Sequence, residues 1–198
     1  MWTHLLFLVS LVGFTSTSSA SSPQDELLRF RLLPRESQIL TEISHPFGIV
    51  KGKFALREGE ANGDVKDLQG TGQVKLTIDA ASYNSGFGPR DQDVQENYLE
   101  VEQYPVITFT SIGIEGVKRP KSVNQGWEFT VKGVLEIHGI KREMRVPVKL
   151  THHERKITVE GSTRILLKDF NVAIPSILFF RAGDSVEVSF RFVGEQRP

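Results

Sequence analysis

Five histidines are the residues of this chain best suited to bind a metal ion, but their spacing does not form a site. His4 lies in an N-terminal stretch that we expect to be removed, and His138 sits at a turn, which leaves His45, His152 and His153. Adjacent His152 and His153 point to opposite sides of an extended chain, which suits solvent better than a shared ion. We therefore expect neither a metal nor any other cofactor.

The residues that could support catalysis also lack the required neighbours. The chain has no cysteine, which excludes a thiolate nucleophile, a disulfide framework and cysteine-ligated metal sites. It contains no Gly-x-Ser-x-Gly elbow, no P-loop and no dinucleotide-binding glycine motif. Asp91 and Asp93 could form an acid and base pair, but they are more simply the negative charges of a helix start. We expect no catalytic residues and no enzyme activity.

Length and charge place these residues in one soluble domain. The chain has 198 residues, enough for one core and too few for two of ordinary size. Its 24 Lys and Arg residues balance 24 Asp and Glu residues, so no strong field attracts nucleic acid. The 39% hydrophobic and 24% charged content is typical of a soluble globular protein.

The N-terminal segment has the pattern of an export signal. Leu5 to Phe14 form an apolar run of about ten residues, half the length of a membrane span, and small residues follow up to Ala20. We expect a signal peptide at residues 1–20 with cleavage near Ala20, a leader at 21–29 and one domain at 30–193. The expected location is periplasmic or secreted, with no integral membrane span.

Nearly all of the remaining sequence alternates apolar with polar residues, which predicts strands that bury one face. Turn signals such as His138-Gly139 separate these stretches and favour antiparallel hairpins. An apolar face must be buried either between two packed sheets or inside a closed barrel, and periodicity leaves both open. The pattern predicts eight or nine strands near residues 28–33, 37–45, 49–57, 73–80, 106–114, 127–137, 142–150, 156–165 and 185–193.

One segment has helical spacing instead. Val94, Tyr98 and Val101 recur at helical intervals within residues 90–102, and Pro105 ends the pattern. The helix would either pack on the sheet and plug one end, or act as a lid whose Tyr98 and Leu99 line an entrance. Arg90 and Asp91 at its start are expected to form an ion pair that fixes the helix on the barrel.

Several motifs follow one another along the chain, and the most specific combination is Arg90-Asp91 followed by Tyr98-Leu-Glu-Val-Glu-Gln-Tyr-Pro105 and Ile107-Thr-Phe109. In their types and order, these motifs resemble the YceI-like family of polyisoprenoid-binding proteins. The resemblance covers about residues 30 to 193. The other matching segments are Asp79-Ala-Ala-Ser82, Val131 to Val148, Lys168-Asp-Phe-Asn-Val172 and Gly183 to Val188.

The resemblance implies an all-β fold: an extended, antiparallel, lipocalin-like β-barrel of about eight strands with one short helix. It also implies export to the bacterial periplasm, a lumen that holds a long isoprenoid or fatty chain, and no general catalytic triad. The chain departs from the family pattern at two places. Glu36-Ser37 stands where relatives often have His-Ser, and Asn171 stands where they have glycine, a substitution that suits left-handed backbone.

A lipid-binding lumen needs an apolar lining with few fixed polar atoms, since each buried methylene contributes about 0.8 kcal/mol and unpaired polar groups cost free energy. Each candidate lining residue is expected on the inward face of its strand, where it could equally be an ordinary core residue. At the mouth, Lys168 or Arg181 could contact a phosphate or a quinone carbonyl, or be ordinary solvated charges. The expected ligand-binding residues are Tyr98, Phe109, Phe129, Ile137, Phe170, Ile174, Phe179 and Phe180.

These observations predict a protein that sequesters or carries a long hydrophobic ligand, such as a polyisoprenoid, an isoprenoid quinone or a fatty-acid derivative. One alternative is a non-enzymatic structural or interaction protein of the cell envelope with a filled barrel. A further alternative, an isomerase or cyclase acting on lipid, would need an ionisable group inside the apolar lumen. The expected partner is a lipid or isoprenoid, nucleic acid is not expected, and a homodimer is left open.

Overall fold

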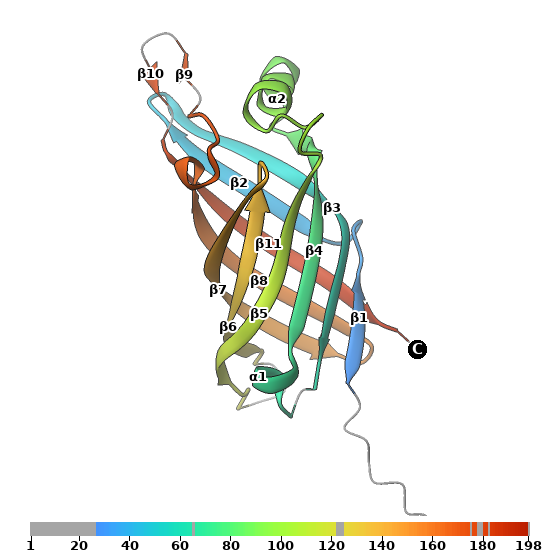
Figure 1. The fold of residues 1–198 in the computed structure, drawn as a ribbon. Helices are drawn as coiled ribbons and strands as arrows, with labels where there is room; N and C mark the ends of the chain where they lie inside the picture. Colours follow the sequence, from blue (N-terminus) through green and yellow to red (C-terminus); the bar gives the residue numbers. More distant parts are fainter. Residues whose placement is uncertain are drawn as a thin grey trace, which may run out of the picture.

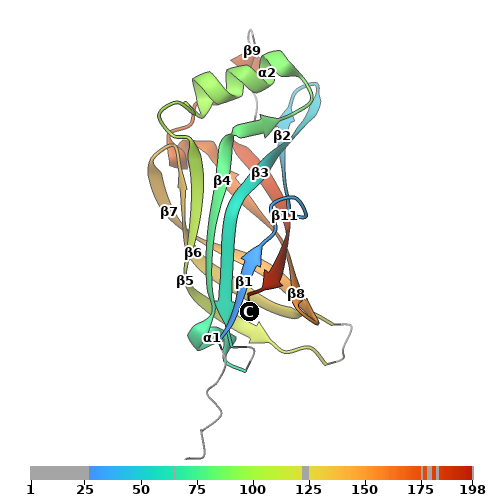
Figure 2. The same ribbon diagram turned by 90° about the vertical axis from the view of Figure 1, so that its right-hand side faces the viewer.

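The computed structural model describes residues 27–64, 66–121, 125–174, 176–177, 180–181 and 183–197. The expected signal peptide at residues 1–20 and the expected leader up to residue 26 lie outside the described residues. The described chain forms an elongated β-barrel with short helical segments at its two ends (Figure 1, Figure 2).

Eight antiparallel strands close the barrel, which confirms the lipocalin-like prediction and excludes two packed sheets. Each strand pairs with its neighbour in the order β11-β2-β3-β4-β5-β6-β7-β8, and β8 pairs again with β11. Residues from Ser185 to Glu195 pair with residues from Leu166 to Lys156 across this closing seam. The strands are β2 (Gln38–His45), β3 (Gly48–Gly63), β4 (Gln73–Asn84), β5 (Val106–Lys118), β6 (Trp127–Ile137), β7 (Ile140–His153), β8 (Lys156–Leu166) and β11 (Ser185–Gln196).

A ninth strand, β1 (Leu28–Leu32), completes the wall where β2 stops. It pairs with β3 on one side and with β11 on the other, the same two neighbours as β2. The turn between β1 and β2 is held by the Ser37 amide, which donates to the Leu33 carbonyl at 3.0 Å. The two strands therefore share one position in the wall. Two further short strands, β9 (Ser176–Ile177) and β10 (Phe180–Arg181), pair with each other.

The period-two pattern places apolar side chains inside, as the sequence predicts. On β6, Val131, Leu135 and Ile137 are buried, while Glu136 between them points outward and lies 3.7 Å from the Lys141 ammonium. The β6–β7 hairpin turns through His138 and Gly139, whose φ angles are 52° and 71°. Positive φ at both central residues is the requirement of a type I′ hairpin turn.

Helical segments lie at both ends of the barrel (Figure 1). The one-turn helix α1 (Leu68–Thr71), which the sequence did not predict, is capped by the Asp67 carboxylate, which accepts from the Gly70 amide at 3.0 Å. The opposite end carries α2 (Gly88–Asp93) and the π-helical turn η1 (Val94–Tyr98), and the 3₁₀ turn η2 (Leu167–Phe170) follows β8.

The predicted helix is present but shifted toward the N-terminus. It begins at Gly88, because Pro89 fits the first helical turn, and it ends at Tyr98 rather than Glu102. Glu100 has a φ of 47°, which breaks the helix before Pro105. None of the helices in the described ranges is long and apolar enough to cross a membrane.

Candidate functional site

The inner face of the barrel is not filled by its own side chains. Val188 and Phe190 on β11 and Met144 on β7 face inward, yet each remains half-exposed. Among the described residues no large side chain is completely buried. Inward-facing residues of an eight-stranded barrel can fill the interior or leave room for one small ligand. Partial exposure on the inner face indicates that room remains.

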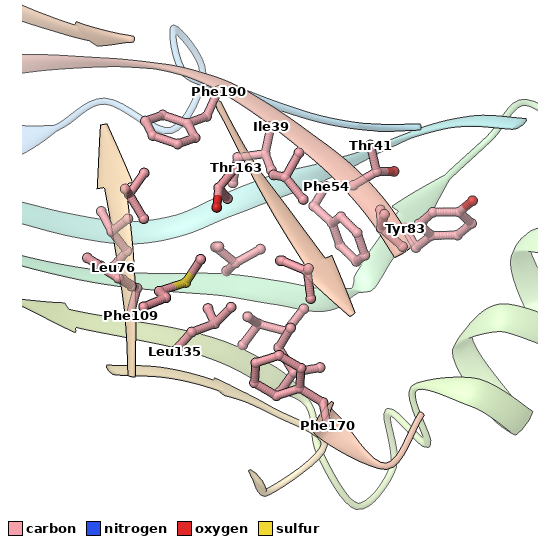
Figure 3. A pocket seen from close by; sticks show the side chains of 18 of the residues that line it. Ile39, Thr41, Phe54, Leu76, Tyr83, Phe109, Leu135, Thr163, Phe170 and Phe190 are labelled. Atoms are coloured by element: carbon pink, nitrogen blue, oxygen red, sulfur yellow. The ribbon is translucent and has the colours of Figure 1, made fainter. Parts of the chain in front are cut away.

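That room is a cavity of about 250 Å³ near the α2 end of the barrel. Aliphatic and aromatic side chains make up most of its wall, including those of Ile39, Leu76, Leu135 and Phe190 (Figure 3). An apolar cavity of about 150 Å³ already stays dry and binds benzene. The larger cavity here is suited to a hydrocarbon chain.

A second, smaller cavity of about 60 Å³ lies toward the α1 end. Phe30, Leu68, Ile114 and His152 line it, and the ring centroids of Phe30 and His152 lie 5.7 Å apart with their planes nearly perpendicular. Both cavities are bordered by the same three residues, Val74, Val131 and Val159. These valines form the boundary between the two parts of the lumen.

The residues expected from sequence are distributed over both cavities. Tyr98, Phe109, Ile137 and Phe170 line the main cavity, whereas Phe129 lines the smaller one. Ile174 is half-buried and borders neither cavity. Phe179 lies outside the described residues, as does the side chain of Phe180. The role of the set in ligand binding stays a prediction.

Sequence reasoning missed the contribution of β2, β8 and β11 to the main cavity. Thr41, Thr163 and Val188 face the lumen from these three strands. Strand parity could have found them, because each occupies the same face of its strand as recognised apolar residues. None of the three was predicted to contact a ligand, because the two threonines are polar and the valine is small.

The helical segment at the barrel end contributes directly to the cavity wall. Val94, Tyr98 and Leu99 line it, and the Gln95 side-chain amide donates to the Tyr83 carbonyl at 3.0 Å, which joins η1 to β4. The segment thus covers this end of the lumen (Figure 2). Both sequence interpretations place the helix at one end of the barrel, and Tyr98 and Leu99, which the lid interpretation put at an entrance, line the main cavity.

Arg90 and Asp91 meet at Ser85 rather than at each other, which corrects the expected ion pair. The Ser85 amide and hydroxyl both donate to the buried Asp91 carboxylate, the amide at 2.8 Å, while Arg90 Nε donates to the Ser85 hydroxyl at 2.8 Å. The Arg90 guanidinium also lies 5.6 Å from the centroid of the Phe87 ring. Helix α2 is therefore attached to the end of β4 through one serine.

This network sets the ionisation of two groups. Burial acts to raise the pKa of Asp91, but the hydrogen bonds from Ser85 and the charge of Arg90 outweigh it and lower the pKa below its ordinary value. Burial raises the pKa of the Tyr83 phenol; the charge of Arg90 opposes this and the Asp91 carboxylate reinforces it. Tyr83 therefore stays neutral near pH 7.

Replacing Asp91 with Ala should lower the free energy of unfolding at pH 7 by about 1–3 kcal/mol, because the Ser85 amide and hydroxyl lose their acceptor. Since the pKa of Asp91 is lowered in the folded state, its contribution is present above the ordinary value of 3.8 and is lost as pH falls below it. Urea unfolding of both proteins at pH 7 and pH 3 measures this. A difference that does not shrink at pH 3 contradicts the assignment.

The two departures from the family motifs have simple structural roles. Glu36 lies on the outside, 3.2 Å from the Lys156 ammonium, and the Ser37 hydroxyl accepts from the Val193 amide at 3.2 Å. Asn171 adopts left-handed backbone with φ 54° and ψ 26° after η2, which confirms the expectation that asparagine replaces glycine there. Lys168 is exposed and lines neither cavity.

The model of the YceI-like domain family matches residues 30–194. The structure resembles Burkholderia cenocepacia BcnA with a TM-score of 0.67 at 22% identity, covering 82% of this chain and 98% of that one. A polyisoprenoid binding domain from Saccharophagus degradans gives 0.63 at 16% identity, with 87% and 100% covered. The Campylobacter jejuni YCEI protein gives 0.54 at 21%, with 75% and 85% covered. A comparison with curated proteins gives no match.

Proposed function

Because the chain belongs to the YceI-like domain family, we propose that it binds a long hydrophobic ligand inside its barrel and sequesters or carries it. The observation that carries this proposal is the main cavity, whose wall is almost entirely aliphatic and aromatic and which the protein's own side chains leave unfilled. Each methylene that moves from water into such a cavity contributes about 0.8 kcal/mol. The ligand class is a polyisoprenoid, an isoprenoid quinone or a fatty-acid derivative.

The lining of the main cavity favours a ligand-binding protein over the two alternatives, a structural protein with a filled barrel and a lipid-modifying enzyme. A structural protein with a filled barrel would not have a cavity of about 250 Å³ in its lumen. A lipid-modifying enzyme would need an acid or base beside its substrate, but no Asp, Glu, His, Lys or Arg of the described residues lines the main cavity. The polyisoprenoid binding domain from Saccharophagus degradans, with a TM-score of 0.63, adds support from a similar fold.

The proposed place of action is the bacterial periplasm. Support comes from the apolar run at Leu5 to Phe14 and the small residues up to Ala20, the pattern of a cleaved signal peptide. A carrier in an aqueous compartment would keep a charged outer surface, as the exposed Arg191 and Glu160 pair on neighbouring strands illustrates.

Native mass spectrometry of the full chain, expressed with its N-terminal segment in a bacterium and purified without detergent, tests the proposal. We expect a mass increment that is released on denaturation and identified as a long-chain lipid after extraction. Added farnesol or geranylgeraniol should bind to the delipidated protein. Repeated absence of any lipid, together with no uptake of these alcohols, would exclude a ligand-binding barrel.

A further inference from the structure

The polar groups of the main cavity are few and of one kind. Thirty described residues line it; four of them bear hydroxyl groups and none bears a charge. The four are Thr41, Tyr83, Tyr98 and Thr163. An ionised group placed in such a wall has no opposite charge to pair with, and its transfer from water costs far more than that of a neutral polar group.

Three of these hydroxyl residues form a row along the hydrogen-bonding direction of the wall. Thr41 pairs with Gly52 on one side and with Val188 on the other, and Val188 pairs in turn with Thr163. Neighbouring strands are about 4.8 Å apart, so the backbones of Thr41 and Thr163 are about 10 Å apart. One ligand can contact both side chains.

Gly52 brings Tyr83 into the same row. A Cβ at residue 52 would lie 2.5 Å from Tyr83 Cε2 and 2.9 Å from Thr41 Oγ1, so the absence of a side chain lets the phenol and the threonine hydroxyl approach each other. Figure 3 shows Tyr83, Thr41 and Thr163 following one another from the α2 end into the barrel. The row therefore runs from the covered end of the lumen toward its interior.

The two threonine hydroxyls are available to a ligand. Within the described ranges, neither Thr41 nor Thr163 forms a side-chain hydrogen bond with the protein, and both side chains are half-exposed to the cavity. A hydroxyl in an apolar wall is stabilised when it gains a hydrogen-bond partner. The positive charge of Arg90, by contrast, is directed to Ser85 and to the Phe87 ring.

We propose that Thr41 and Thr163 select a ligand that carries an uncharged hydrogen-bonding group, a carbonyl or a hydroxyl, and draw this group inside the lumen. This inference rests on the proposed function and narrows it: an isoprenoid alcohol, quinone or fatty amide fits the site, whereas a polyprenyl phosphate or an ionised fatty acid does not. The head of the ligand is then enclosed together with its tail.

Equilibrium dialysis of the full chain with three probes that share one tail tests the inference: farnesol, farnesyl phosphate and the hydrocarbon farnesene. We expect farnesol to bind at least tenfold more tightly than farnesyl phosphate. The double variant Thr41→Val, Thr163→Val should lose about fivefold of its affinity for farnesol, because it removes both possible partners of the one hydrogen bond that the farnesol hydroxyl makes, and it should keep its affinity for farnesene. Valine preserves the shape of threonine, so the fold should persist.

Thr158→Val is the matched control, because Thr158 lies on β8 with Thr163 but lines neither cavity. It should bind all three probes like the parent protein. Equal affinity for farnesol and farnesyl phosphate, or an unchanged preference for farnesol over farnesene in the double variant, overturns the inference and leaves the binding function intact. Failure of all three probes to bind overturns both.

Discussion

Replacing Met144 with Trp should reduce the affinity for farnesol at least tenfold while the barrel stays folded. Met144 faces the main cavity and is half-exposed to it. Its cross-strand partner is Gly133, over which the Phe109 ring lies: a Cβ at residue 133 would be 2.3 Å from Phe109 Cζ. The interior of an eight-stranded barrel is only wide enough for side chains or one small ligand. An indole at this position therefore occupies the path of the ligand.

Val134→Trp is the matched control for this variant. Val134 lies on β6, beside Gly133, but lines neither cavity, so its replacement adds the same indole outside the lumen. Overpacking costs about 1–3 kcal/mol where the space is already filled, and less where a cavity accepts the new atoms. Circular dichroism and thermal unfolding check the fold, and dialysis measures the affinity. Undiminished farnesol binding by Met144→Trp would place the ligand outside the main cavity.

The strands could be predicted from sequence because one face of each is buried. Alternation along Trp127–Ile137 identified β6 with its observed bounds, and His138-Gly139 identified the hairpin that follows. Closure could not be derived from periodicity, since a packed pair of sheets needs the same alternation. It depends on the pairing of β8 with β11, and only the resemblance to a known family pointed to it.

The candidate site was harder to predict for a related reason. Parity tells which face of a strand points inward, but not how far along the barrel a residue lies or whether space remains beside it. Phe109 and Phe129 both point inward from their strands and have the same 8% exposure, yet they border different cavities. Thr41 and Thr163 were missed because the predicted lining contained only hydrophobic and aromatic residues, and these two threonines are among the few polar residues that could orient a ligand.

The difference between Phe109 and Phe129 leads to a paired prediction. Each ring is buried to the same extent, so Phe109→Ala and Phe129→Ala should each lower the free energy of unfolding by about 3–5 kcal/mol. Their effects on binding should differ. Phe109 contributes its ring to the main cavity, and losing that contact should weaken farnesol binding roughly tenfold, the equivalent of about 1.4 kcal/mol of apolar contact.

Phe129→Ala should leave farnesol affinity within about twofold of the parent, because its ring borders only the smaller cavity beyond Val131. Urea unfolding gives the stability of each variant, and dialysis at a temperature where both are folded gives the affinity. Equal loss of binding in the two variants would mean that affinity follows stability rather than contact with the ligand. A tenfold loss confined to Phe129→Ala would place the ligand at the α1 end instead. Only a loss of affinity confined to Phe109→Ala is consistent with a farnesyl tail held in the main cavity, on the α2 side of the valine boundary.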